Sequence, residues 1–180
     1  MTGVTVYTIG HSTRTADEFS NILKAFGIDL VADIRTIPRS RRNPQFERDV
    51  LSRALADQGI QYLHIGGLGG LRHPGKDSPN GGWRNNSFRG YADHMQTQEF
   101  AAALAELIVA AKEKTAAIMC AEAVPWRCHR SLVGDALVVR GIEVIDILSA
   151  VNSRAHRLTS WARVEGLRIT YPSSDLITAR

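Results

Sequence analysis

The stretch Ile118-Met-Cys-Ala-Glu-Ala-Val-Pro-Trp-Arg-Cys-His-Arg130 decides the fold of this chain and gathers most of its chemistry. It contains both cysteines of the sequence, together with a glutamate, a histidine and two arginines. The apolar run 116–119 at its start predicts a buried strand, and the apolar periodicity over 132–137 predicts one face of a helix. The reactive residues therefore lie on a strand-to-helix turn, where an α/β sheet usually binds its ligand.

Strand and helix patterns alternate outward from this turn. Strand patterns cover 4–9, 28–34, 60–65, 116–119 and 142–148. The capping box Thr15-Ala-Asp-Glu18 starts one helix, another spans 47–58, Thr97 starts a third, and a fourth follows Pro125. Gly-Ile pairs beginning at 27, 59 and 141 indicate helix ends. The alternation predicts an α/β fold with a mainly parallel five-stranded sheet and helices on both faces, a Rossmann-like three-layer sandwich. We expect the strand order 3-2-1-4-5.

Length and composition predict a single α/β domain over residues 1–180. The chain is 44% apolar and 22% charged, which is ordinary for a globular protein. No run approaches eighteen apolar residues and no signal peptide precedes the first strand, so we expect no membrane contact. Two cysteines do not make a disulfide framework, and they favour a cytoplasmic location. The net charge of +4 permits an anionic partner.

Polar residues follow the predicted strands at the point where each strand ends. Right-handed crossovers bring these ends to one edge of a parallel sheet. The residues concerned are His11 and Ser12, Asp33 and Arg35, His64, Cys120 with Glu122, and from the last strand Asp146. This convergence predicts a functional site at that edge.

Two segments depart from the alternation. Residues 66–90 form a long stretch rich in Gly, Pro, Asn and Ser, which indicates a lid or binding loop over the same edge. We expect it to be more mobile than the sheet. Residues 151–180 form a C-terminal extension, in which the alternation of Leu167, Ile169 and Tyr171 indicates an edge strand.

Four motifs resemble a bacterial and archaeal family catalogued as domain of unknown function 488. They are Thr8-Ile-Gly-His-Ser12, Val31-Ala-Asp-Ile-Arg35 with Pro38 and Ser40-Arg41, Leu68-Gly-Gly70, and Met119-Cys-Ala-Glu122 with Pro125 and Cys128-His-Arg130. The resemblance covers about residues 5–150. It implies a fold and a set of site positions, and the family has no established activity.

The two cysteines admit different roles. Cys128 begins the apolar helix face as a structural residue, or it is a reactive thiol in the first helical turn, or it ligates a metal. In the second case the helix dipole and a neighbouring arginine would lower its pKa. Cys120 is expected in the core. On a helix, His129 would point about 100° away from Cys128, toward the sheet edge or onto the helix end.

Glutamate and histidines at the sheet edge are candidates for acid/base chemistry. Glu122 serves as general base or metal ligand, or it only accepts hydrogen bonds from loop amides or pairs with an arginine. His11 and His64 matter through their joint placement. A divalent metal is a cofactor that Cys128, His129, Glu122, His11 and His64 would allow, although their spacing matches no recognised metal motif.

Arginines supply the signal for an anionic ligand. Arg35, Arg39, Arg41 and Arg42 fall close together, and guanidinium groups match phosphate oxygens. Arg35 ends a buried strand, so it pairs with a carboxylate such as Asp33 or Glu122, or it meets a bound anion. The glycine run over 66–70 is a weaker phosphate signal. Several aromatic residues could stack on bases: Trp83, Phe88, Tyr91 and Trp126.

These residues support three hypotheses. The first is an enzyme with a phosphate-bearing substrate, a nucleotide or nucleic acid, at the C-terminal edge of the sheet, with hydrolytic or transfer chemistry. Its predicted catalytic residues are Glu122, Cys128, His129, His11 and His64, and its predicted anion-binding residues are Arg35, Arg41, Arg130 and Ser12. The second is a nucleotide or nucleic-acid binding protein without chemistry. The third is a thiol or metal-dependent sensor. We expect Arg35, Glu122 and Arg130 to lie together, with an anion between Arg35 and the start of the 125–140 helix.

Overall fold

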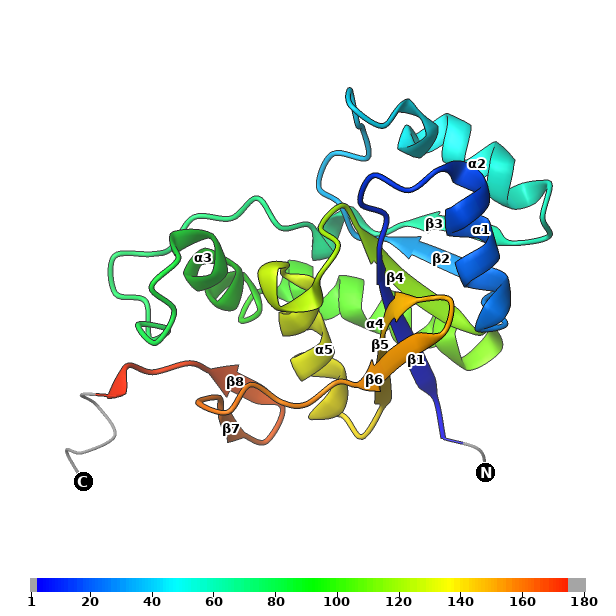
Figure 1. The fold of residues 1–180 in the computed structure, drawn as a ribbon. Helices are drawn as coiled ribbons and strands as arrows, with labels where there is room; N and C mark the ends of the chain where they lie inside the picture. Colours follow the sequence, from blue (N-terminus) through cyan, green and yellow to red (C-terminus); the bar gives the residue numbers. More distant parts are fainter. Residues whose placement is uncertain (1–2, 175–180) are drawn as a thin grey trace.

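A mostly parallel six-stranded sheet forms the centre of the molecule in the computed structural model, which describes residues 3–174 (Figure 1). The strand order is β3-β2-β4-β1-β5-β6, and only β6 runs antiparallel to its neighbour. The strands are β1 (Thr5–Gly10), β2 (Leu30–Asp33), β3 (Gln61–His64), β4 (Ala116–Cys120), β5 (Glu143–Ser149) and β6 (Asn152–Ala155).

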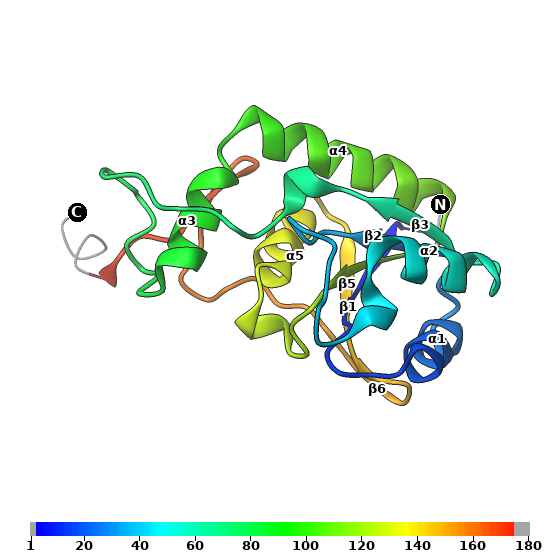
Figure 2. The same ribbon diagram turned by 90° about the horizontal axis from the view of Figure 1, so that it is seen from above.

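Helices cover both faces of this sheet, as predicted (Figure 2). On one face α1 (Ala16–Ala25) and α2 (Arg48–Ala56) bury Phe19, Leu23 and Leu55 against the strands. On the other face α4 (Gln98–Glu113) and α5 (Arg130–Val138) bury Leu104 and Leu132 in a second core. Removal of these apolar side chains from water on both faces stabilises the layered arrangement.

Local signals for the helix ends are confirmed. Thr15 Oγ1 accepts a hydrogen bond from Glu18 N at 3.1 Å, and Thr15 N donates to Glu18 Oε2 at 2.7 Å, which completes the capping box. Thr97 Oγ1 accepts from Phe100 N at the start of α4. The three predicted end glycines have positive φ angles, between 63° and 75°: Gly27, Gly59 and Gly141.

The predicted strand order 3-2-1-4-5 is wrong, because β4 rather than β1 lies beside β2. Residues 116–119 of β4 are all fully buried, whereas Thr5 and Tyr7 of β1 are only half-buried. A continuous apolar strand is suited to the position with the deepest cover on both faces. The two orders share the contact between the ends of β1 and β4: His11 N donates to Cys120 O at 2.8 Å.

The C-terminal extension contributes differently from the prediction. Its first part, β6, adds a sixth strand, so the predicted count of five was too low. The strand expected near Ile169 is β8 (Arg168–Thr170), which pairs with β7 (Arg163–Glu165) in a separate two-stranded sheet. It is not an edge strand of the main sheet; Ile169 and Tyr171 are instead buried in the core cluster that contains Leu104 and Leu132. Residues 175–180 of the predicted extension lie outside the described residues.

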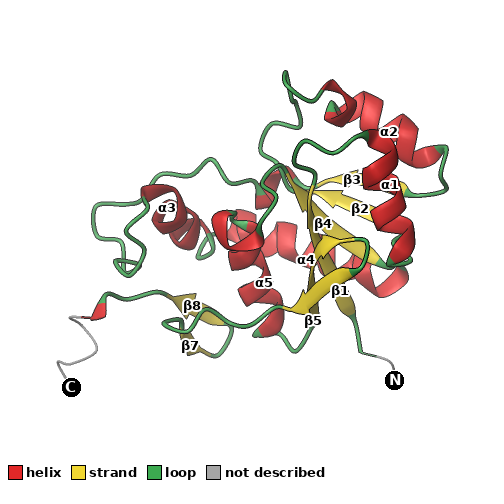
Figure 3. Cartoon of the chain, viewed as in Figure 1, coloured by secondary structure: helices red, strands yellow, loops and turns green. Residues whose placement is uncertain are grey.

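Two local predictions around the site need correction. The helix expected over 125–140 is split into a 3-10 turn, η3 (Pro125–Arg127), and α5, which starts at Arg130. The long segment after β3 begins with a 3-10 turn, η2 (Gly66–Leu68), continues as loop over 69–85, and enters a helix, α3 (Asn86–His94) (Figure 3). The side chain of Asn85 starts α3 by accepting from Ser87 N and Phe88 N.

No helix within residues 3–174 combines the length and the apolar character that crossing a membrane requires.

Candidate functional site

A pocket of about 450 Å³ lies at the C-terminal edge of β2 and β4. A pocket of this size suits a small-molecule ligand. Four parts of the chain line it: the link after β2, the segment after η2 with the start of α3, the end of β4, and the link before α5. The lining residues are Arg35, Thr36, Ile37, Arg39, Gly70, Leu71, Ser87, Phe88, Cys120, Ala121, Glu122, Arg127, Cys128 and His129.

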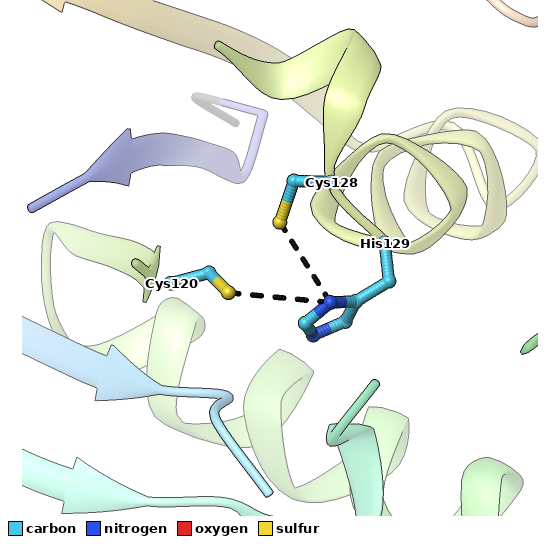
Figure 4. A group of neighbouring side chains, drawn as sticks. All are labelled: Cys120, Cys128 and His129. Atoms are coloured by element: carbon cyan, nitrogen blue, oxygen red, sulfur yellow. Dashed lines mark hydrogen bonds between the residues drawn. The ribbon is translucent and has the colours of Figure 1, made fainter. Parts of the chain in front are cut away.

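Both thiols and one imidazole converge on one wall of this pocket (Figure 4). His129 Nδ1 lies 3.7 Å from Cys128 Sγ and 4.0 Å from Cys120 Sγ. All three atoms lie within 4.8 Å of one another, and both cysteines are free. Cys120 packs against the core, as expected, but it is only half-buried and also lines the pocket.

The backbone at Cys128 explains why two adjacent side chains can meet. Cys128 is extended, with φ −133° and ψ 146°, because it links η3 to α5 rather than sitting in a helical turn. The expectation that His129 points away from Cys128 assumed a helix and is wrong for this reason. Cys128 Sγ instead accepts a hydrogen bond from Arg130 N at 3.4 Å and so satisfies a free amide of the first turn of α5.

The ring of His129 is held in one orientation. Its Nε2 lies 3.1 Å from the carbonyl oxygen of Ile34, which can only accept, so Nε2 carries the hydrogen. In the neutral ring, Nδ1 then presents a lone pair toward the sulfurs. Tyr91 packs against the ring at 5.0 Å between centroids. Gly70 leaves the necessary space, because a Cβ there would lie 2.5 Å from Nδ1.

The two thiols differ in acidity. A hydrogen bond from Cys128 lowers the pKa of Cys120, and the charge of Arg130 acts in the same direction against burial. The same sulfur–sulfur contact and burial raise the pKa of Cys128. The more acidic thiol is therefore Cys120, whereas the sequence pointed to Cys128.

Arg35 forms a buried ion pair with Asp33, the last residue of β2. Its guanidinium donates to Asp33 at 2.6–3.2 Å, and Tyr62 OH donates to Asp33 Oδ2 at 2.6 Å. Burial opposes the charge of Arg35, but the hydrogen bonds and charge of Asp33 outweigh it and raise the pKa. Of the two partners considered, Asp33 and Glu122, the structure selects Asp33.

His11 and His64 position Arg35 rather than face the pocket. His11 Nδ1 donates to Ser12 O at 2.8 Å, and its Nε2 accepts from Arg35 Nη1 at 3.4 Å. Burial, followed by the charge of Arg35, lowers the pKa of His11, which agrees with a neutral ring. His64 Nε2 lies 2.8 Å from Arg35 O. Neither histidine lines the pocket, so the structure does not bring them into contact with a ligand there.

Arg35 and Glu122 line the same pocket and Arg130 contacts the backbone of Glu122, but no ion pair joins the three within the described residues. Arg130 is fully buried and donates through Nη1 to the backbone oxygen of Glu122 at 2.7 Å. The Glu122 carboxylate is exposed on the pocket and makes no ion pair within residues 3–174. The charge of Arg130 shapes the 122–123 turn, and the carboxylate stays open to a ligand.

Ser12 and Arg41 were predicted anion ligands, and both lie outside the pocket. Ser12 has φ 50°, an uncommon conformation for a residue other than glycine, and its amide donates to Ala121 O. Arg41 is exposed and lines a neighbouring hollow, which shares Arg39 with the pocket. Arg39 and Arg127 thus take the positions at the pocket that the sequence assigned to Arg41 and Arg130.

The segment 66–90 forms one wall of the pocket, through Gly70, Leu71, Ser87 and Phe88. Its polar residues gather on Asp93 of α3, which accepts hydrogen bonds from Gly75 N, Ser78 Oγ and Asn80 Nδ2 at 2.6–2.9 Å. The expected position over the site is therefore observed. The glycine run has a packing role, since Gly70 adjoins His129. Greater mobility of this segment stays a prediction.

A second cluster of buried polar residues was not predicted from the sequence, except for Asp146. His156 lies 3.0 Å from Asp135 Oδ1 and 3.3 Å from Asp146 Oδ2, and Tyr171 OH donates to Asp135 at 2.8 Å. Thr8 Oγ1 also donates to Asp146. A carboxylate within the apolar face of α5 was the available signal for Asp135. Asp146 belongs to this cluster rather than to the pocket.

Fold and site together define an α/β protein with a pocket of thiols and arginines at the C-terminal edge of its sheet. The family model described as Domain of unknown function DUF488 matches residues 15–137, more than half of the sequence. The chain belongs to that family, as its motifs indicated. No curated protein and no solved structure matches it.

Proposed function

We propose that this protein is an enzyme that binds a phosphate-bearing substrate in the pocket and catalyses a hydrolytic or transfer reaction on it. The observation that supports this most is that one pocket holds two arginines without carboxylate partners, Arg39 and Arg127, together with thiol, imidazole and carboxylate side chains. Arg39 and Arg127 are exposed on the pocket and make no ion pair within the described residues. Guanidinium groups free of carboxylates are suited to bind phosphate oxygens.

The apolar residues at the mouth favour a nucleotide over a bare phosphate. Ile37 and Leu71 line the pocket with 58% and 71% of their surface exposed. Phe88 contributes a half-buried ring to the same wall. Apolar side chains left exposed beside a charged pocket are suited to cover the base or sugar of a ligand whose phosphates reach the arginines.

The pocket residues divide into three roles. Arg39 and Arg127 bind the anion, and Arg35 adds a fixed positive charge held by Asp33. Glu122 is the acid/base candidate, since its carboxylate is open on the pocket. Cys120, Cys128 and His129 form the reactive wall, beside Gly70 of the loop segment.

Calorimetry with ATP as the probe tests the anion site. Arg127→Ala should weaken binding by about 1.5–3 kcal/mol, the usual loss when a hydrogen bond to a charged group is removed. Arg53→Ala, which removes an exposed arginine of α2 away from the pocket, is the matched control and should leave binding unchanged. Equal affinity in all three proteins would remove the basis for an anion site here.

Turnover distinguishes an enzyme from a binding protein. Phosphate release from a panel of nucleotides should be measured for the wild type and for Glu122→Gln. We expect release by the wild type and a loss of about 100-fold or more in the variant, as for a general acid or base. Binding of ATP without release by the wild type would instead support the non-catalytic nucleotide-binding alternative.

A further inference from the structure

The geometry points to a metal site: we infer that Cys120, Cys128 and His129 bind a zinc-like divalent cation, with its fourth position open to the pocket. The inference that a metal binds here depends only on the geometry of these three residues. The role of the metal, to hold a water or a phosphate oxygen of the substrate, rests on the proposed function.

The distances between the candidate ligand atoms match tetrahedral coordination. Zinc bonds of about 2.3 Å to sulfur and about 2.0 Å to nitrogen place a sulfur and a nitrogen ligand about 3.6 Å apart. His129 Nδ1 lies 3.7 Å and 4.0 Å from the two sulfurs. Both sulfur–nitrogen distances are therefore within a few tenths of an ångström of the tetrahedral value, and all three atoms lie within 4.8 Å of one another.

The surroundings orient these ligands as a metal site requires. A histidine ligand commonly donates its other ring N–H to a carbonyl or carboxylate, and His129 Nε2 donates to Ile34 O. The amide of Arg130 donates to Cys128 Sγ, which favours an anionic sulfur. Gly70 allows the imidazole to stand where it does. His129 and Cys128 are thus oriented before a cation binds.

The coordination that results is open. Three protein ligands leave one tetrahedral position vacant, which is the arrangement of catalytic rather than structural zinc sites. All three ligands line the pocket, beside Arg127 and Glu122. Two thiolates and a neutral imidazole balance the charge of a divalent ion, so the arginines remain available to an anionic ligand. A disulfide between the cysteines would give no role to the Nδ1 atom of His129 or to the hydrogen bond from His129 Nε2 to Ile34 O.

Stoichiometric loading tests the site. Protein purified with a reductant and stripped with a chelator is titrated with zinc, and with cobalt to observe thiolate-to-metal charge transfer. We expect about one equivalent of bound metal and a cobalt spectrum typical of tetrahedral thiolate coordination. Cys120→Ser, Cys128→Ser and His129→Gln should each weaken zinc binding by at least about tenfold. His73→Gln, which alters an exposed histidine outside the site, is the matched control.

A variant that retains all three ligands separates misfolding from ligand loss. Gly70→Ala places a methyl group against the ring of His129 and should weaken the cobalt charge-transfer band, while circular dichroism shows an unchanged helical content. The inference is overturned by wild-type protein that binds no zinc, by full binding in His129→Gln, or by a disulfide that persists under reductant. Zinc binding without ATP binding would support the metal site and contradict the proposed function. ATP binding without zinc binding would support the proposed function and contradict the metal site.

Discussion

Arg35 Nη2 lies 2.6 Å from Asp33 Oδ2, with both side chains almost fully buried, yet a pocket opens beside the pair. The pair thus has a structural role and also borders the ligand site. Arg35→Ala leaves Asp33 charged and unpaired in the core, so we expect a loss of about 3–5 kcal/mol in the free energy of unfolding. Urea denaturation measures it.

The double variant Arg35→Leu/Asp33→Leu is the control for this pair. Because it removes both charges, it should be more stable than Arg35→Ala. A variant Arg35→Ala of unchanged stability but reduced affinity for ATP would show instead that Arg35 acts mainly on the ligand.

His156 gives the protein a pH-dependent stability. Burial alone would lower the pKa of His156, but hydrogen bonds and charges of Asp135 and Asp146 outweigh it and raise the pKa to about 9. An unfolded histidine titrates near about 6.5. Because the folded value is higher, the stabilisation is fully present below about pH 6.5 and is lost as the pH rises through about 9, by up to roughly 3 kcal/mol.

Thermal and urea unfolding at pH 6 and pH 9.5 measure this effect. The wild type should lose stability between the two values more steeply than His156→Asn, which has no ring to titrate. Arg154 and Tyr171 also face the two carboxylates; burial and the charge of Asp135 raise the pKa of Tyr171, so its hydroxyl stays neutral over this range. Parallel pH profiles for wild type and variant would contradict the assignment.

Tyr171 ties the C-terminal extension to α5. Its hydroxyl donates to Asp135 Oδ2 at 2.8 Å inside the core. Tyr171→Phe should lower the free energy of unfolding by about 1.5–3 kcal/mol, since a buried carboxylate loses a hydrogen-bond donor. Tyr7→Phe is the control, because the described residues give the Tyr7 hydroxyl no hydrogen-bond partner. Equal losses in both variants would indicate a general effect of removing a hydroxyl.

Patterns within short stretches predicted much of this fold. The Thr15 capping box, the end glycines and the apolar strands are local features, and the structure confirms them. The strand order depended on which strand is buried most deeply, which no single stretch encodes. The predicted edge does carry a pocket, because the ends of parallel strands meet there; that the pocket is a functional site stays a prediction.

The details of the site could not be predicted for a different reason. Cys128 and His129 meet because the chain is extended at Cys128, while the apolar periodicity suggested a helix from Pro125 onward. Arg130 satisfies backbone oxygens and Arg39 lines the pocket, although nothing in the sequence distinguishes the roles of these two arginines. Side-chain direction decided these roles, and it follows from tertiary packing.

Gly10 allows the end of β1 to close against the turn that carries Glu122. A Cβ at position 10 would lie 1.8 Å from the backbone oxygen of Glu122, which also accepts from Arg130 Nη1. Gly10→Ala must therefore displace this turn and weaken the hydrogen bond of a buried guanidinium. We expect a loss of more than about 2 kcal/mol in stability, since both overpacking and a buried charge are involved.

The same variant should also weaken ATP binding, because the displaced turn carries the Glu122 side of the pocket. Gly3→Ala is the matched control: no atom lies within 4 Å of a Cβ at position 3, so its stability and affinity should equal those of the wild type. Urea denaturation and calorimetry on the two variants give both quantities. A Gly10→Ala protein as stable as Gly3→Ala would mean that the turn gives way at little cost, and that its position is not what holds the pocket in shape.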